Sequence, residues 1–156
     1  MAIEKGIRFS VDHDDAFPQG LVMVGEVSPD NEYQSREERA QGRPTRQRVD
    51  EVTGKRQWKF MATDPGETKA KRASFEITLL ADVQPVPTTA EVMPGMRPVE
   101  LDGLTAEPRV TGQGEYKYLS YVFRATGFKA VGSGTGSTSG GKAARSTAGE
   151  SSAKAA

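Results

Sequence analysis

Hydrophobic residues alternate with polar ones along much of the chain, which is the pattern of half-buried β-strands. In residues 74–83 (SFEITLLADV), Phe75, Ile77 and Leu79 fall on one side and Ser74, Glu76 and Thr78 on the other. Residues 56–62 (RQWKFMA) place the only tryptophan, Trp58, on the same side as Phe60. Residues 7–11 (IRFSV) alternate in the same way. We therefore expect strands at these three places, with Trp58 and Phe60 in the core.

Three further stretches predict strands of other kinds. Residues 20–29 (GLVMVGEVSP) are apolar on both faces, as in a central strand, and end at Pro29. Residues 116–128 (YKYLSYVFRATGF) direct Leu119, Tyr121, Phe123 and Ala125 toward a core and Tyr116 and Tyr118 away from it. Residues 99–110 supply a short edge strand with a turn at Asp102 and Gly103.

The connections between these strands are long and polar. Residues 46–60 predict a hairpin whose turn contains Gly54, because such turns commonly need a positive φ. Residues 30–45 predict a loop with one short helical turn at 35–39. The prolines at 85, 87, 94 and 98 exclude a central strand from 84–98 and indicate an extended crossover.

This order of elements predicts one mainly β domain over residues 1–131. Five or six strands with long loops are typical of a small barrel, and the oligonucleotide-binding (OB) fold is the member of that class that binds single strands. Residues 132–156 contain Gly, Ser, Thr and Ala with no large apolar side chain. Such a segment buries too little surface to offset its ordering entropy, so we expect a disordered C-terminal tail.

The composition argues against an enzyme, a metal site or a cofactor. The chain has no cysteine and a single histidine, His13, which stands among aspartates in DHDD and is expected in a solvated acidic loop. No phosphate-binding loop, Rossmann pattern or nucleophile elbow occurs. The N-terminus lacks the apolar core of a signal peptide, and no apolar run is long enough to span a bilayer. We therefore expect a soluble, cytoplasmic protein.

The formal net charge of zero conceals an uneven distribution. Residues 1–35 carry two basic and seven acidic side chains, whereas residues 36–72 carry eleven basic and six acidic ones. A local basic surface attracts phosphate even on a neutral protein. The candidate nucleic-acid-binding residues are the cations of this region and the two outward tyrosines: Arg46, Arg48, Lys55, Arg56, Lys59, Lys69, Lys71, Arg72, Tyr116 and Tyr118. The alternative interpretation is a solvated charged surface with tyrosines packed at a sheet edge.

Several segments together resemble a known family. The succession FPQG, VGEVSP, QRVDEVTGKRQWKF, DVQPVP, RPVELDGLTAEPRV and YLSYVFRATG, over roughly residues 7–130, is similar to small proteins of actinobacterial integrative and conjugative elements. These are plasmid replication, integration and excision activators. The resemblance implies an accessory protein of a mobile element, and it transfers no site residues.

Two hypotheses of different classes follow. In the first, the protein binds DNA, with a single strand as the expected ligand, through a basic face of the barrel. In the second, it is a non-enzymatic interaction module that docks a replication initiator or a recombinase; a phage structural protein is a weaker third. Cations gathered on one face favour the first hypothesis and scattered cations the second, while the sequence leaves the oligomeric state open.

Overall fold

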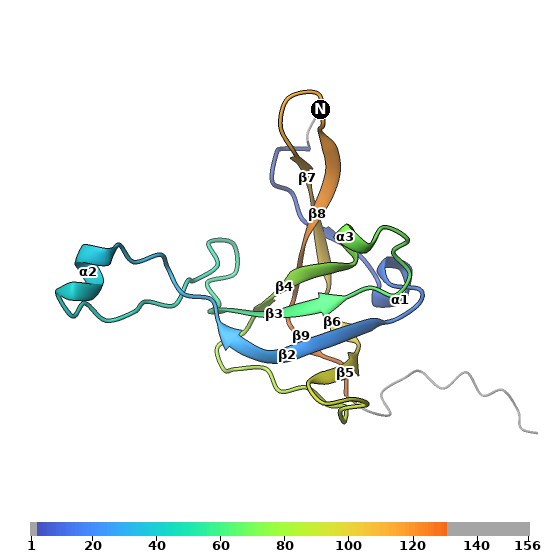
Figure 1. The fold of residues 1–156 in the computed structure, drawn as a ribbon, viewed down its shortest axis with the longest axis horizontal. Helices are drawn as coiled ribbons and strands as arrows, with labels where there is room; N and C mark the ends of the chain where they lie inside the picture. The colour runs from blue at the N-terminus through green and yellow to red at the C-terminus, as the bar shows by residue number, and fades with distance from the viewer. Residues whose placement is uncertain (1–2, 131–156) are drawn as a thin grey trace, which may run out of the picture.

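The computed structural model describes residues 3–130, and this part of the chain is mainly β (Figure 1). The strands are β1 (Phe9–Ser10), β2 (Leu21–Pro29), β3 (Gln57–Thr63), β4 (Ser74–Leu80), β5 (Met96–Val99), β6 (Leu101–Asp102), β7 (Thr105–Thr111), β8 (Tyr118–Ala125) and β9 (Gly127–Phe128). The helices are short: α1 (His13–Ala16), α2 (Arg36–Ala40) and α3 (Ala70–Ala73). No helix among the described residues is long and apolar enough to cross a membrane. The predicted boundary at residue 131 and the predicted tail lie outside the described residues.

Seven strands form one mixed sheet in the order β1-β7-β8-β4-β3-β2-β5. All neighbours are antiparallel except β4 and β8, which run parallel. The strands β2, β3 and β4 follow one another in the sheet, and after the crossover of residues 81–95 the chain returns as β5 beside β2. This arrangement is a Greek key. The strands β6 and β9 pair separately.

The mainly β class was predicted, but the barrel is not confirmed, because the hydrogen-bonded sheet is not closed. The strand count was also too low. Residues 99–110 were expected to form one short edge strand. Instead, β5 ends at Val99, and β7 begins at Thr105 and lies between β8 and β1. Pro98 is in the edge strand β5. An edge strand tolerates proline, because the missing N–H does not interrupt the hydrogen bonds of a central strand.

The core forms on the face of the sheet where the alternating apolar residues of β3 and β4 lie side by side. Trp58 pairs with Leu79 and Phe60 with Ile77, and Ile77 and Leu79 are fully buried. The Trp58 indole Nε1–H donates to the backbone carbonyl of Ala81 at 2.9 Å, which satisfies the one polar atom of this side chain. The prediction that Trp58 and Phe60 are core residues is therefore confirmed.

The local predictions for the β2–β3 connection are also confirmed. The helix α2 begins after a capping box in which the Ser35 hydroxyl accepts from the Glu38 backbone N–H and the Glu38 carboxylate accepts from the Ser35 N–H. The hairpin of residues 46–60 turns at Gly54, with φ +72°, above an isolated bridge between Val49 and Arg56.

The prediction for β8 was wrong over its first half. Leu119 and Tyr121 were expected in the core but are 57% and 50% exposed, whereas Phe123 packs against the core and Ala125 is buried. Figure 1 shows the reason, because the β7–β8 hairpin projects beyond the other strands and its distal half has no layer to pack against.

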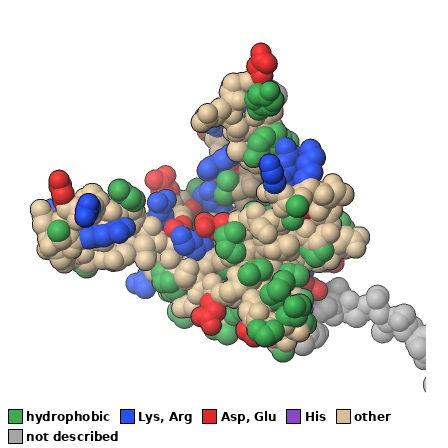
Figure 2. Space-filling view, in the orientation of Figure 1, with side chains coloured by type: hydrophobic (Ala, Val, Ile, Leu, Met, Phe, Trp, Pro, Cys, Tyr) green, Lys and Arg blue, Asp and Glu red, His purple; other side chains and the backbone are tan. Residues whose placement is uncertain are grey.

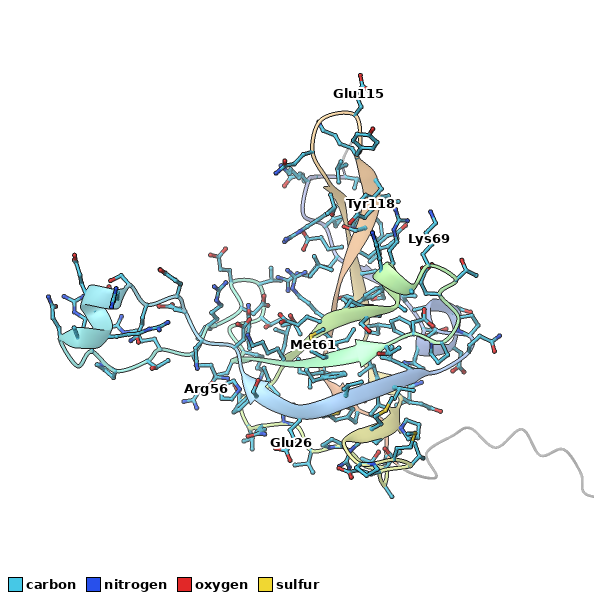
Figure 3. All side chains as sticks on the ribbon, viewed as in Figure 1. Glu26, Arg56, Met61, Lys69, Glu115 and Tyr118 are labelled. Atoms are coloured by element: carbon cyan, nitrogen blue, oxygen red, sulfur yellow. The ribbon has the colours of Figure 1, made fainter. Side chains whose placement is uncertain are left out.

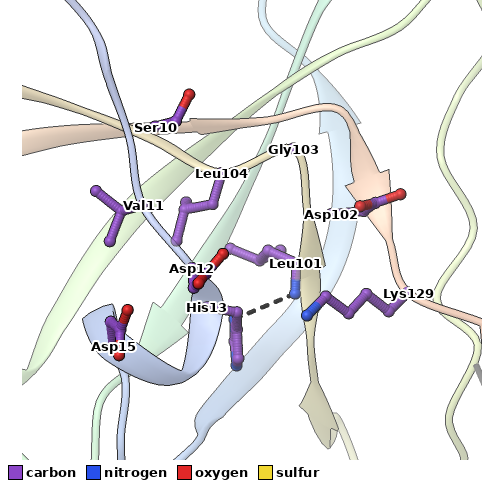
Figure 4. Close-up of a pocket in the computed structure, with 10 residues that line it drawn as sticks. All are labelled: Ser10, Val11, Asp12, His13, Asp15, Leu101, Asp102, Gly103, Leu104 and Lys129. Atoms are coloured by element: carbon purple, nitrogen blue, oxygen red, sulfur yellow. Dashed lines mark hydrogen bonds between the residues drawn. The ribbon is translucent and has the colours of Figure 1, made fainter. Parts of the chain in front are cut away.

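The prediction for His13 was wrong as well. The histidine is 2% exposed in α1, where its Nδ1 accepts the backbone N–H of Leu101 at 3.2 Å (Figure 4). Among the described residues its Nε2 has no hydrogen-bond partner, and burial lowers the pKa of the ring, so the imidazole is neutral. A short helix reorients the ring toward the core, whereas an extended acidic loop would have left it in water.

The two faces of the β3–β4 pair predict different responses to truncation. Ile77→Ala removes a fully buried side chain and should lower the free energy of unfolding by about 2–5 kcal/mol. Met61→Ala, at a 46% exposed position on the opposite face of β3, should change it by less than about 1 kcal/mol. Urea denaturation of both variants measures this, and equal losses would contradict the assignment of faces.

Candidate nucleic-acid interface

Two arms project from the sheet (Figure 1), and residues of both arms line a hollow. One arm is the β2–β3 connection, residues 30–56, and the other is the β7–β8 hairpin. The hollow, which we call the interarm cleft, has a volume of about 530 Å³. The residues that line it are Gly6, Arg8, Glu32, Arg48, Val49, Asp50, Glu51, Val52, Gln57, Glu107, Arg109 and Arg124.

An ion pair between the partly buried Arg8 and the buried Asp50 connects the two arms at the cleft. Both terminal nitrogens of Arg8 donate to the Asp50 carboxylate, at 2.9 and 2.6 Å. Asp50 is 1% exposed and also accepts from the backbone N–H and the hydroxyl of Thr53. The hydrogen bonds from Arg8 hold the pKa of Asp50 well below its usual range. Because Arg8 precedes β1, which pairs with β7, this contact fixes the hairpin turn of one arm against the base of the other.

A second buried carboxylate orients two more arginines. Glu107 of β7 accepts from Arg109 at 3.0 Å and from Arg124 of β8 at 2.6 Å, and these two hydrogen bonds lower the pKa of its carboxyl group. The cleft as a whole is lined by four arginines and four carboxylates, so its formal charge is zero, and the arginines at Asp50 and Glu107 act through their orientation. A guanidinium has five N–H donors, so arginines held in this way keep donors for a phosphate.

A third cationic group lies beside Tyr118, next to the β8 strand of the hairpin. The guanidinium carbon of Arg72 lies 4.3 Å from the ring centroid of Tyr118, which is a cation–π contact. Lys69 and Lys71 are exposed in the same short segment, and Figure 3 shows Lys69 on the same side of the hairpin as Tyr118. Tyr118 is 40% exposed, so an aromatic surface and three cations are accessible together.

The other predicted residues are distributed differently. Arg48 and Lys59 lie at 3.8 and 3.9 Å from the Asp30 carboxylate, and Arg48 lines the cleft. Arg46 is exposed on the β2–β3 arm, and Tyr116 is 86% exposed in the β7–β8 turn.

Two predicted cations lie away from the cleft. Lys55 pairs with Asp82 at 2.7 Å, and Figure 3 shows Arg56 on the far side of the arm's base from the β7–β8 hairpin. The structure therefore does not bring Lys55 and Arg56 together with the other candidate residues.

Sequence reasoning missed the arginines at the centre of this surface. Arg8, Arg109 and Arg124 come from the two ends of the domain, and only the pairing of β1, β7 and β8 brings them together. One signal was present, because Arg124 falls on the same outward side of its strand as Tyr118. Figure 2 shows Lys and Arg side chains over the β2–β3 arm, between the arms and beside the hairpin, with Asp and Glu side chains among those between the arms.

Comparisons with known proteins give this surface no precedent. No protein-family model matches the chain, and neither the curated proteins nor the solved structures yield a significant match. The resemblance to plasmid activators therefore stays a prediction, and the argument for function rests on the geometry.

The Asp50 ion pair predicts a specific loss of stability in acid. Because its pKa is lowered in the folded state, the unfolded state binds the proton more tightly, so the contribution is present above about pH 4 and is lost as the pH falls below that value. Asp50→Asn leaves the Arg8 charge unpaired and should cost about 3–5 kcal/mol at pH 7. The difference between variant and parent should shrink in acid, as measured by urea denaturation from pH 7 to pH 3.

The control is Glu51→Gln, which removes the neighbouring exposed carboxylate and should leave the profile unchanged. The neutral His13 lowers stability on acidification in both proteins and cancels in the comparison. A constant difference at all pH values would refute the assigned role of the Asp50 charge.

Proposed function

We propose that the protein binds single-stranded DNA along the interarm cleft and the adjoining outer face of the sheet, as a non-enzymatic accessory factor. The observation that carries this proposal is the set of Arg72, Tyr118 and Lys69 beside the hairpin, because the strand register puts Tyr118 on the same face of the hairpin as the cleft arginines. Cations that follow the backbone and aromatic rings that stack on bases are the two components of single-strand binding surfaces.

The architecture supports the same proposal. Oligonucleotide-binding folds are partly open Greek-key barrels that bind their ligand on one sheet face between two long loops. In this chain β5, β2, β3 and β4 form a Greek key, and the two arms border the outer face of β3 and β4. An OB-like barrel that closes only partly is the finer form of the fold that we propose.

The tyrosines favour a single strand over a duplex. A ring stacks on a base only when that base is free of its neighbours, as in a single strand. Tyr118 and Tyr116 are accessible on the hairpin, and the Arg72 guanidinium over Tyr118 adds a planar cation that also stacks on bases. The cleft arginines then contact the phosphates, and each phosphate contact releases counterions.

The biological role that we propose follows the sequence resemblance. As an accessory protein of a mobile element, the chain would hold a strand exposed during replication, integration or excision and so activate these processes. A second candidate, the docking of an initiator or recombinase, is favoured by the crossover after β4, where Val83 and Val86 are 78% and 75% exposed. Such docking needs no DNA affinity, which separates the two candidates.

Charge reversal tests the proposed surface. Lys69→Glu/Lys71→Glu should weaken the binding of a labelled single-stranded oligonucleotide at least about tenfold and reduce the slope of log affinity against log salt by about 1.4, since two phosphate contacts are lost. Fluorescence anisotropy at several salt concentrations measures both quantities. The matched control is Lys55→Glu/Arg56→Glu, which makes the same change in net charge away from the cleft.

Equal weakening by both double variants would show that only bulk charge acts, and the site would be rejected. Absence of binding by the parent protein at low salt would reject the DNA-binding proposal as a whole and favour the docking function.

Stacking on Tyr118 makes a separate prediction. Tyr118→Ala should reduce single-strand affinity by about 5- to 150-fold, the equivalent of about 1–3 kcal/mol for one stacked base. Tyr118→Phe keeps the ring and should bind as the parent does, with affinity measured by the same anisotropy titration. Equal losses in the two variants would point to the hydroxyl group and contradict stacking.

A further inference from the structure

The side of the β7–β8 hairpin that faces away from the cleft is apolar and exposed. Its members, which we call the hairpin apolar face, are Phe9 of β1, Pro108 and Val110 of β7, and Leu119 and Tyr121 of β8. Register places them together, because Val110 pairs with Leu119, Pro108 with Tyr121 and Phe9 with Ala106. The exposed fractions are 44% for Phe9, 50% for Tyr121, 57% for Leu119 and 73% for Val110.

This face contrasts with the other side of the same hairpin. The alternate positions there include Glu107, Arg109, Ser120 and Arg124, which belong to the cleft side. None of the five residues of the hairpin apolar face is charged, although 27% of the chain is charged. At its base the face continues into the core, because the ring of Tyr121 lies 6.1 Å from that of Phe123. A contiguous exposed patch of this kind is typical of an interaction site.

We propose that the hairpin apolar face binds the same face of a second copy of this chain, as a two-fold symmetric dimer. A surface without charge complements itself when two copies meet about a two-fold axis, since no like charges are brought together. The formal net charge of the chain is zero, so the two copies also approach without overall repulsion.

Strand addition to the hairpin is a less suitable use of the same region. The edge of β7 beyond β1 contains Pro108, which has no N–H to donate to an added strand. Packing of the side chains of the face does not depend on that missing donor, and an apolar face fits another apolar face.

The size of the patch indicates a weak dimer. The four residues whose exposed fractions are given above, together with Pro108, expose roughly 500 Å² per copy, or about 1,000 Å² for two, which is at the lower limit of a specific interface. We therefore expect a dissociation constant in the micromolar range. Because the cleft lies on the other side of the hairpin, the dimer leaves both clefts open. If the proposed function holds, on which this consequence rests, one long DNA strand would engage both clefts of a dimer.

The test measures the oligomeric state of the full chain by sedimentation equilibrium from low to high micromolar concentration. The parent should change from 16.8 kDa toward twice that mass as its concentration rises. Leu119→Glu places a charge at the centre of the face and should remain monomeric. Val86→Glu, at a 75% exposed position in the crossover, is the matched control and should dimerise as the parent does.

A second variant protects the test against misfolding. Val110→Lys charges the strand partner of Leu119 with the opposite sign and should also be monomeric, and circular dichroism of both variants should show the parent's unfolding midpoint. A parent that stays at 16.8 kDa throughout, or variants that dimerise as the parent does, would overturn the proposal.

The outcome is independent of DNA binding. Leu119→Glu should bind a short single-stranded oligonucleotide with the parent's affinity, because it lies on the side of the hairpin opposite the cleft. A parent that dimerises without binding DNA would leave the dimer standing and reject the proposed function, whereas a monomer that binds DNA would do the reverse.

Discussion

The pairing of β3 with β4 is the constraint on which the rest of the structure depends. Seven residue pairs hold the two strands in one register, and the alternate pairs bury Trp58, Phe60, Ile77 and Leu79 in the core. Since a slip of one residue would expose all four, burial determines the register. The same alternation directs Lys59 and the other intervening residues outward, so the outer face of the sheet is a consequence of the core.

Two buried carboxylates hold the arginines of the interarm cleft in position. Asp50 and Glu107 belong to different arms, yet each binds arginine side chains at the same cleft. A buried ion pair adds little net stability after desolvation, but the loss of one partner is expensive. We therefore interpret these carboxylates mainly as groups that hold arginines in fixed positions, which would reduce the entropic cost of binding under the proposed function.

The β7–β8 hairpin combines two surfaces in one element. Near the sheet its inward side belongs to the core through Phe123 and Ala125, and farther out the same side has nothing to cover it. Its other side carries Tyr118 beside Arg72 and leads to the cleft arginines. Two sides of opposite character on one projecting ribbon would let the two proposed partners, a second copy and a nucleic acid, bind without competing.

Local patterns in the sequence were sufficient to predict strands with a neighbour on each side, such as β3. In β3 the alternation at Trp58 and Phe60 follows directly from burial. The capping box at Ser35 and the turn at Gly54 were predictable for the same local reason. Leu119 shows the limit of this reasoning, since alternation assigns a side of the strand but cannot say whether another layer covers it. His13 and the arginines at Asp50 and Glu107 depend on contacts between residues far apart in the chain, such as Arg8 with Asp50 across 42 positions. The sequence alone thus determined most of the strands and the apolar side of each predicted one, although not the separate strands β6 and β7 within residues 99–110. Only the tertiary structure decided which apolar sides are buried and which cations meet, because both depend on how distant segments pair.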